Sequence, residues 1–214
     1  MLLAGALGVA PGKVLILGGG VVGRNAAQIA VGMGAEVVII DRSAAKMREL
    51  EETFSNRVTT RYSSQSEIEQ QLATADVVVG AVLVAGATAP KLVNREMLAL
   101  MRPGSIIVDV AIDQGGCFET SRATTHVEPV YDVDGILHYC VANMPGTVPL
   151  TSTFSLAGAT LPYIIEFAEH GVLESLKNNT NTRNGLNLYK GQVTHEAVAQ
   201  PLNKEAIEPL RVLN

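Results

Sequence analysis

The sequence predicts an α/β fold with helices on both faces of a doubly wound parallel sheet, followed by an extra C-terminal helical segment. Apolar runs of strand length alternate with helical patterns over residues 13–113, as in successive βαβ units. Gly18 to Gly23 form a glycine-rich turn between the first run and the first helical pattern. Hydrophobic residues make up 47% and aromatic residues only 4%, so the core is aliphatic, which suits buried parallel strands.

Six apolar runs are expected to form strands. Most are continuous stretches of Val, Ile and Leu, a pattern that indicates burial on both faces of the sheet. The runs cover residues 13–18, 36–41, 57–62, 76–83, 105–113 and 136–141. Asp134-Gly135 separates the last run from residues 129–133 and predicts a hairpin turn. Residues 114–135 are otherwise expected to form a long polar loop.

Helical patterns separate the first five strands. We expect helices over residues 22–33, which stop at Gly34, and over residues 43–54, which open on a capping serine. A capping box at residues 66–69 predicts a short helix to Ala75, and residues 94–102 predict another. Residues 151–171 predict a long helix, in which Pro162 either produces a kink or starts a second helix.

The glycine-rich turn has the G-x-G-x-x-G spacing of dinucleotide-binding loops. In such loops Gly18 would permit the tight turn, Gly20 would let a pyrophosphate approach the backbone, and Gly23 would let the helix pack on the sheet. The spacing alone is weak evidence, since three glycines can simply make a turn. Here it follows a strand and opens a helix, and Asp41 ends the next strand. This context favours a phosphate site at the N-terminus of the helix and a Rossmann domain over residues 1–148.

Asp41 is placed to accept hydrogen bonds from the hydroxyls of the adenosine ribose. Its charge would repel a 2′-phosphate, which favours NAD over NADP, and the adjacent Arg42 weakens that preference. A solvated strand end is the alternative interpretation of Asp41. Val82 and Leu83 are expected to end the fourth strand, where they would meet the nicotinamide half of a dinucleotide.

Asp113 is a candidate catalytic residue at the end of the fifth strand. A carboxylate there could orient water or ammonia, or could stabilise a charged intermediate; a turn-capping role is equally compatible with the sequence. Asp109, inside the strand, is expected to be a buried, hydrogen-bonded carboxylate. Cys117 follows the glycine turn and is expected to be accessible but to lack a base, whereas Cys140 is expected in the core.

Several classes of protein are disfavoured by composition. The net charge of −5 and the absence of a long basic run argue against nucleic-acid binding. The apolar stretches are strand-sized, which argues against a membrane span, and the first residues contain no basic region typical of a signal peptide. Two cysteines do not make a disulfide framework, so we expect a cytoplasmic protein. None of the four histidines has metal-ligand spacing, so we expect no metal site.

The sequence resembles bacterial alanine dehydrogenases. The resemblance is carried by residues 102–121, which read RPGSIIVDVAIDQGGCFETS, and by residues 13–23, 80–83, 89–93 and 138–146. It implies a Rossmann fold and the oxidative deamination of L-alanine to pyruvate and ammonia with NAD as cofactor. The NAD-binding part of proton-translocating transhydrogenases shares the glycine loop but usually differs at residues 111–113 and 117–119.

The resemblance also implies roles for individual positions. Asp113 would be the catalytic aspartate of the family. The residues expected to bind the cofactor are Gly18, Gly20, Val21, Val22, Gly23, Asp41, Lys46, Ser63, Val82, Leu83, Val110, Ala111, Ile112, Asp113, Arg122, Val141, Ala142, Asn143 and Met144.

Complete enzymes of this family carry a substrate domain ahead of the glycine loop, with a catalytic His and with the Lys and Arg that bind the substrate carboxylate. About a dozen residues precede the first strand here. We therefore expect the chain to bind NAD but to be incomplete for catalysis, with L-alanine or pyruvate bound through a substrate domain outside it. Residues 149–214 would form the helical segment that returns to that domain, and the assembly would be a homo-hexamer. A non-catalytic NAD(H)-binding module or a transhydrogenase-like subunit is the alternative.

Overall fold

The computed structural model describes residues 1–83 and 88–213. This part of the chain divides into two compact units, one that ends at Met144 and one that begins at Pro145. The first unit holds a large sheet with helices on both faces. The second is mainly helical, with one small hairpin.

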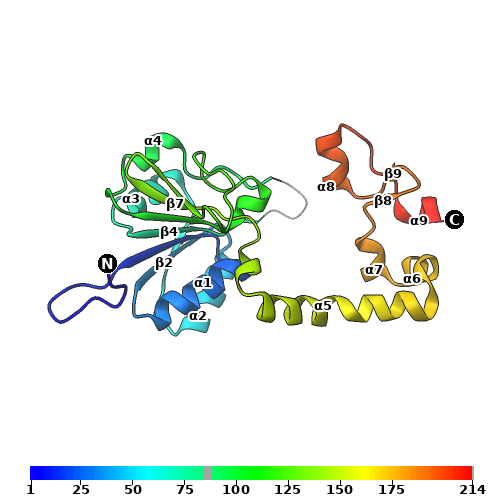
Figure 1. Ribbon diagram of the computed structural model, residues 1–214, viewed down its shortest axis with the longest axis horizontal. Coiled ribbons are helices and arrows are strands. Elements are labelled where there is room, and N and C mark those ends of the chain that lie inside the picture. The colour runs from blue at the N-terminus through cyan, green and yellow to red at the C-terminus, as the bar shows by residue number, and fades with distance from the viewer. Residues whose placement is uncertain (84–87, 214) are drawn as a thin grey trace. The chain divides into compact units, whose positions relative to one another are not determined.

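Seven strands form the sheet of the first unit, in the order β3-β2-β1-β4-β5-β7-β6 (Figure 1). Their bounds are β1 (Lys13–Leu17), β2 (Glu36–Asp41), β3 (Thr59–Tyr62), β4 (Val77–Gly80), β5 (Ile106–Asp109), β6 (Val130–Val133) and β7 (Ile136–Tyr139). All neighbouring strands are parallel except β6 and β7. The strand order reverses between β1 and β4, which is where doubly wound sheets bind ligands. The predicted fold class is confirmed.

Side chains that alternate along β1 and β2 divide the core into two layers. Val14, Ile16 and Ile39 pack with α1 (Val21–Gly32) and α2 (Ala44–Phe54). Leu15, Leu17 and Ile40 pack with the opposite layer, which includes α3 (Gln65–Leu72) and α4 (Arg95–Leu98). Figure 1 shows these two pairs of helices on opposite faces of the sheet. Both faces of the central strands are therefore buried, as their continuous apolar runs predict.

Two strands are shorter than the sequence predicts. β4 stops at Gly80 rather than at Leu83, and β5 stops at Asp109 rather than at Asp113. Residues after Asp109 turn into a 3-10 helix, η1 (Val110–Gln114), because the Asp109 carboxylate accepts a hydrogen bond from the Ala111 amide and caps it. The apolar character of residues 110–112 therefore reflects a buried turn, not a longer strand.

Local capping chemistry also corrects the start of α3. Ser64, not Ser66, is the N-cap, and its hydroxyl accepts from the Glu67 amide. The S-x-x-E spacing of a capping box fits Ser64 and Glu67, so the predicted box was misplaced by two residues. The Asp134-Gly135 hairpin is confirmed. Both residues have positive φ, and β6 and β7 pair antiparallel on either side of them.

The second unit begins within η2 (Met144–Thr147), and its first α-helix is the 22-residue α5 (Pro149–His170). Pro162 lies inside α5, so it does not start a second helix. The remaining elements are α6 (Val172–Asn178), α7 (Thr180–Asn184), β8 (Leu188–Tyr189), β9 (Gln192–Val193), α8 (Glu196–Ala199), η3 (Gln200–Leu202) and α9 (Pro209–Leu213). Over residues 1–83 and 88–213, no helix has the length and hydropathy that a membrane span requires.

Candidate dinucleotide-binding site

A cavity of about 600 Å³ opens at the carboxyl ends of β1, β2 and β4. This volume is in the range of small-molecule and cofactor sites. Eight residues that the sequence predicts to bind the cofactor line it, namely Gly18, Gly20, Val21, Val22, Asp41, Ser63, Val82 and Leu83. The other lining residues are Leu17, Ile40, Arg42, Ala81, Pro90 and Leu92. The wall is mainly apolar, with Asp41 and Arg42 as its charged members.

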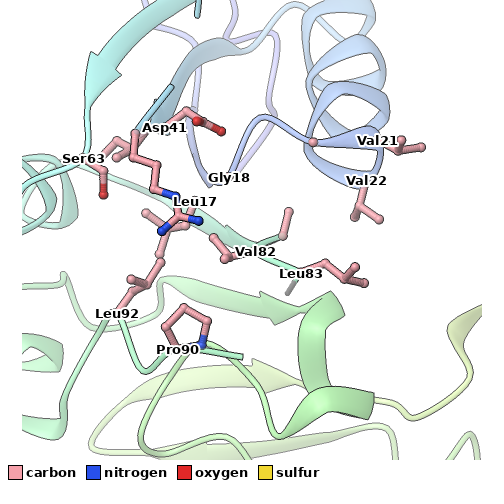
Figure 2. A pocket seen from close by; sticks show the side chains of 14 residues that line it. Leu17, Gly18, Val21, Val22, Asp41, Ser63, Val82, Leu83, Pro90 and Leu92 are labelled. Atoms are coloured by element: carbon pink, nitrogen blue, oxygen red, sulfur yellow. The ribbon is translucent and has the colours of Figure 1, made fainter. Parts of the chain in front are cut away.

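Side chains from separate elements surround this cavity. Figure 2 shows Val21 and Val22, at the start of α1, on one side and Ser63, after β3, on the opposite side. Val82 lies between them, and Pro90 and Leu92 close the cavity from the loop that leads to α4. The lining residues place the cavity at the carboxyl ends of β1 and β4, where the strand order reverses.

The three glycines of the motif meet different steric requirements. Gly18 has φ of 99°, and a Cβ on it would lie 2.9 Å from the carbonyl oxygen of Ala81. A Cβ on Gly23 would lie 1.8 Å from the carbonyl oxygen of Gly18, so only glycine lets α1 approach the loop this closely. No heavy atom lies within 4 Å of the position that a Cβ on Gly20 would take. Gly20 therefore leaves open space in the cavity wall, as a pyrophosphate would need.

The N-terminus of α1 faces this space, and within residues 1–83 and 88–213 no hydrogen bond engages the amides of Val21 and Val22. The first N–H groups of a helix have no acceptor within the helix. Gly20 is the N-cap and has no side chain that could accept from them. Together with the positive end of the helix dipole, these amides suit the binding of an anion next to Val21 and Val22.

Asp41 is held in one orientation at the end of β2. One carboxylate oxygen accepts from the Gly19 amide and the other from the Ser43 amide, each at 2.8 Å. Each oxygen keeps a second lone-pair site, so the carboxylate can still accept hydrogen bonds from two hydroxyls. The backbone of the glycine loop thus fixes the acidic residue that the sequence predicts to bind the ribose.

The other predicted cofactor residues lie outside the cavity wall. Gly23 packs beneath the loop, and the Lys46 ammonium forms an ion pair with Glu49 at 2.6 Å. The guanidinium of Arg122 lies 4.0 Å from the centre of the Tyr131 ring. Asp113 is exposed on η1. The rest belong to η1 or follow β7, and they are Val110, Ala111, Ile112, Val141, Ala142, Asn143 and Met144.

A buried carboxylate organises the turn that carries Asp113. Asp109 is fully buried, and one of its oxygens accepts from the Cys117 amide at 2.8 Å and from the Ser121 hydroxyl at 2.5 Å. The other oxygen accepts from the Ala111 amide at 3.2 Å. Burial raises the pKa of Asp109, and these hydrogen bonds partly oppose the rise. The prediction of a buried, hydrogen-bonded Asp109 is confirmed.

Cys117 is buried rather than accessible, which corrects the sequence-based expectation. Its side chain is fully buried, and its amide is bound to Asp109. Burial and the neighbouring Asp109 charge raise the pKa of the Cys117 thiol to about 11. The thiol is therefore protonated and unreactive at neutral pH. Cys140 is buried as predicted.

Residues 89–93 of the loop after β4 pair with residues 114–119 of the loop after β5. The Ala89 and Leu92 amides donate to the carbonyls of Gln114 and Cys117, each at 2.8 Å. The Lys91 ammonium donates to the Gly115 carbonyl at 2.5 Å and to the Phe118 carbonyl at 2.9 Å. Asp113 thus stands on a turn tied to the loop that closes the cavity.

A second buried polar group lies behind this turn. His138 is fully buried on β7, where Nδ1 donates to the Ile136 carbonyl at 2.9 Å and Nε2 accepts from the Thr120 hydroxyl at 2.8 Å. Its ring stacks on Tyr131 with centroids 5.0 Å apart. Burial lowers the pKa of His138, so the ring is neutral at pH 7. In the described part of the chain, no three His, Cys, Asp or Glu side chains are grouped so that they could hold a metal ion.

The sequence matches the family described as "Alanine dehydrogenase/PNT, C-terminal domain" over residues 1–196. The chain belongs to this family. Among curated relatives of this alanine dehydrogenase/PNT domain, the alanine dehydrogenase of Halomonas elongata is 50% identical over 208 residues, which are 97% of the chain and 56% of that relative. The alanine dehydrogenase of Bacillus subtilis is 50% identical over 214 residues, 100% of the chain and 57% of the relative. The chain thus spans little more than half the length of these relatives.

Solved structures agree with this family membership. An L-alanine dehydrogenase has a TM-score of 0.86 and 49% identity, covering 94% of the chain and 56% of the solved protein. A transhydrogenase from Sinorhizobium meliloti has a TM-score of 0.68 and 27% identity, covering 88% of the chain and 51% of that protein. The alanine dehydrogenase branch of the family is therefore the more similar of the two.

Sequence reasoning missed part of the cavity wall. Pro90 and Leu92 belong to residues 89–93, which carry part of the family resemblance but have no predicted role; hydrogen bonds from the Ala89 and Leu92 amides to the next loop hold this segment beside the cavity. Leu17, Ile40 and Ala81 could have been expected from their places at the carboxyl ends of β1, β2 and β4. Arg42 was considered only as a modifier of Asp41, although its position directly after β2 predicts that it reaches the same site.

Proposed function

We propose that this chain is the NAD-binding part of an L-alanine dehydrogenase, which converts L-alanine, NAD and water to pyruvate, ammonia and NADH. One observation carries the dinucleotide assignment: the glycine loop, the N-terminus of α1 and the fixed Asp41 carboxylate all border one cavity. The similarity to alanine dehydrogenases at about 50% identity supports the substrate.

The cavity fits the chemistry of a dinucleotide. The open side of Gly20 and the amides at the start of α1 would hold the pyrophosphate. Asp41 would accept from the ribose hydroxyls, with Ser63, Pro90 and Leu92 around the adenosine. Val82 and Leu83, just beyond the carboxyl end of β4, would contact the nicotinamide half.

The bound nicotinamide would supply the hydride acceptor for the reaction. Asp113 is the residue of this chain that we propose for proton handling, because its exposed carboxylate stands on η1, just beyond the carboxyl end of β5. The buried Asp109 would keep this turn in place. Residues that bind the carboxylate of alanine would come from a substrate domain outside this chain, so we expect the chain alone to bind NADH and to turn over little or no alanine.

By the same resemblance we propose a homo-hexamer in the cytoplasm. Sedimentation velocity of the chain, with and without NADH, would measure the mass of the assembly. A monomer under both conditions would contradict the proposal that these residues suffice for assembly.

The cofactor proposal is tested by calorimetric titration of the chain with NADH. We expect Asp41→Ala to weaken NADH binding by about tenfold to a hundredfold, since it removes a charged acceptor of two hydrogen bonds. Glu52→Ala, which removes an exposed acidic residue of α2 outside the cavity, should bind NADH like the parent chain. Absence of NADH binding, or equal affinity in Asp41→Ala, would contradict the proposal.

A further inference from the structure

The charged residues of the cavity wall are adjacent in sequence and opposite in sign. Asp41 ends β2, and Arg42 follows it. Asp41 cannot swing toward its neighbour without losing the bonds from the Gly19 and Ser43 amides. The Ser43 amide also closes a turn around residue 42, so the same bond fixes the backbone from which the arginine side chain starts.

Arg42 differs from the other cations near the glycine loop. Arg24 lies 3.3 Å and Lys46 2.6 Å from carboxylate oxygens of Glu49, so this one glutamate balances both. Within residues 1–83 and 88–213, no hydrogen bond or ion pair engages the side chain of Arg42, which is exposed and borders the cavity. Its five N–H donors are thus available to a ligand.

This arrangement places two opposed determinants at the ribose end of the site. An acidic residue at the end of the second strand selects the free 2′-hydroxyl of NAD, whereas a nearby arginine accommodates the 2′-phosphate of NADP. This chain has both residues. The guanidinium suits a phosphate because it can donate two parallel hydrogen bonds to its oxygens. The fixed Asp41 carboxylate repels the same group.

We propose that Arg42 is a specificity-determining residue whose guanidinium can bind the 2′-phosphate of NADPH. In the parent chain, repulsion between this phosphate and the Asp41 carboxylate prevents that contact. This inference rests on the proposed NAD site and specifies how that site discriminates between nucleotides. Arg42 adds little for NADH, which has no 2′-phosphate. Its contribution becomes visible once Asp41 is neutral, because the attraction then acts without the opposing charge.

The test is a double-mutant cycle on the full chain, with Asp41→Asn, Arg42→Met and the combined variant. Binding of NADH and NADPH is measured by calorimetry, together with 5′-AMP and 2′,5′-ADP, two fragments that differ only in the 2′-phosphate. We expect Asp41→Asn to narrow the preference for NADH over NADPH at least tenfold. Adding Arg42→Met should then weaken the binding of NADPH and 2′,5′-ADP about tenfold or more, which is the contribution of a charge-assisted hydrogen bond. The affinities for NADH and 5′-AMP should change less than about threefold.

A matched control and a conservative variant keep the test decisive. Arg24→Met removes an arginine of α1 that is paired with Glu49 and does not line the cavity, so it should leave the NADPH to NADH ratio unchanged. In the Asp41→Asn background, Arg42→Lys should bind NADPH more tightly than Arg42→Met does, because it keeps a positive charge. Raised salt should weaken the binding of NADPH more than the binding of NADH.

Two results would overturn the inference. One is equal NADPH affinity with and without Arg42 in the Asp41→Asn background. The other is an equal loss of both nucleotides in Arg42→Met, which would mean that the side chain packs on the adenosine common to both. If Asp41→Asn disturbs the loop, the same comparison is made in the Asp41→Ser background, which is also neutral and keeps an oxygen acceptor; there Arg42→Met should weaken the binding of 2′,5′-ADP but not of 5′-AMP. Failure of the parent chain to bind NADH would instead overturn the proposed function, and this inference with it.

Discussion

Replacement of Asp109 by asparagine keeps the size of the side chain in the turn after β5. It exchanges one carboxylate oxygen, a hydrogen-bond acceptor, for an NH2 group, a hydrogen-bond donor. If the new amide nitrogen takes the place of Oδ2, it faces the Cys117 amide and the Ser121 hydroxyl; if it takes the place of Oδ1, it faces the Ala111 amide. Either way, a buried backbone N–H meets another donor. Such an unmet donor costs about 1–3 kcal/mol, and a hydrogen bond to a charged group contributes about 1.5–3 kcal/mol.

One effect acts in the opposite direction. Removal of the charge relieves the desolvation that raises the pKa of Asp109. Because three protein donors contact the carboxylate within 3.2 Å, lost hydrogen bonding exceeds this relief. We expect Asp109→Asn to lower the free energy of unfolding of the first unit by about 2–4 kcal/mol.

Hydrogen exchange measured by mass spectrometry localises the effect within a chain of two units. Amides of residues 106–121 should exchange roughly 30- to 700-fold faster in Asp109→Asn, as about 2–4 kcal/mol corresponds to that factor. Asp113→Asn is the matched control, because this exposed residue lies on the same turn. Unchanged protection of residues 106–121 in Asp109→Asn would refute the reasoning.

Two further predictions concern buried titratable side chains. Because the pKa of Cys117 is raised to about 11, the contribution of its thiol to the free energy of unfolding is present below the ordinary thiol pKa and is lost as pH rises toward 11. At pH 8, iodoacetamide should therefore modify Cys117 only after the chain is unfolded in urea. Rapid labelling of Cys117 in the folded chain would contradict this prediction. Because the pKa of His138 is lowered, its contribution is present above the unfolded pKa of about 6.5 and is lost as pH falls below it. In urea titrations, the free energy of unfolding should therefore decrease between pH 7.5 and 5.5, and it should decrease less in His138→Gln. An equal decrease in both chains would exclude His138 as the cause.

Much of the first unit could be predicted because its local signals agree with its long-range packing. Continuous apolar runs specify strands that are buried on both faces, and capping residues such as Ser43 specify where a helix begins. The Asp134-Gly135 turn was predictable because few residue pairs accept positive φ at both positions. The glycine loop was predictable because its steric demands act on neighbouring residues, as the contact between Gly23 and the Gly18 carbonyl shows.

The remaining features depend on hydrogen bonds that a pattern of apolar residues does not record. An apolar run cannot show that β5 ends at Asp109, because the cause is a side-chain bond that turns the backbone. Burial of Cys117 follows from Asp109, eight residues earlier, which binds its amide. Pro90 and Leu92 reach the cavity through hydrogen bonds with the following loop.

The pairing between the loops after β4 and β5 also limits how this protein can evolve. Four backbone hydrogen bonds link the amides of residues 89, 92, 93 and 119 to carbonyls in the opposite loop, and the Lys91 ammonium donates to two further carbonyls there. An insertion or deletion in one loop would shift its donors out of step with acceptors in the other. Change in length is therefore expected to occur in both loops together or in neither, so relatives that vary here should carry coupled insertions rather than single ones.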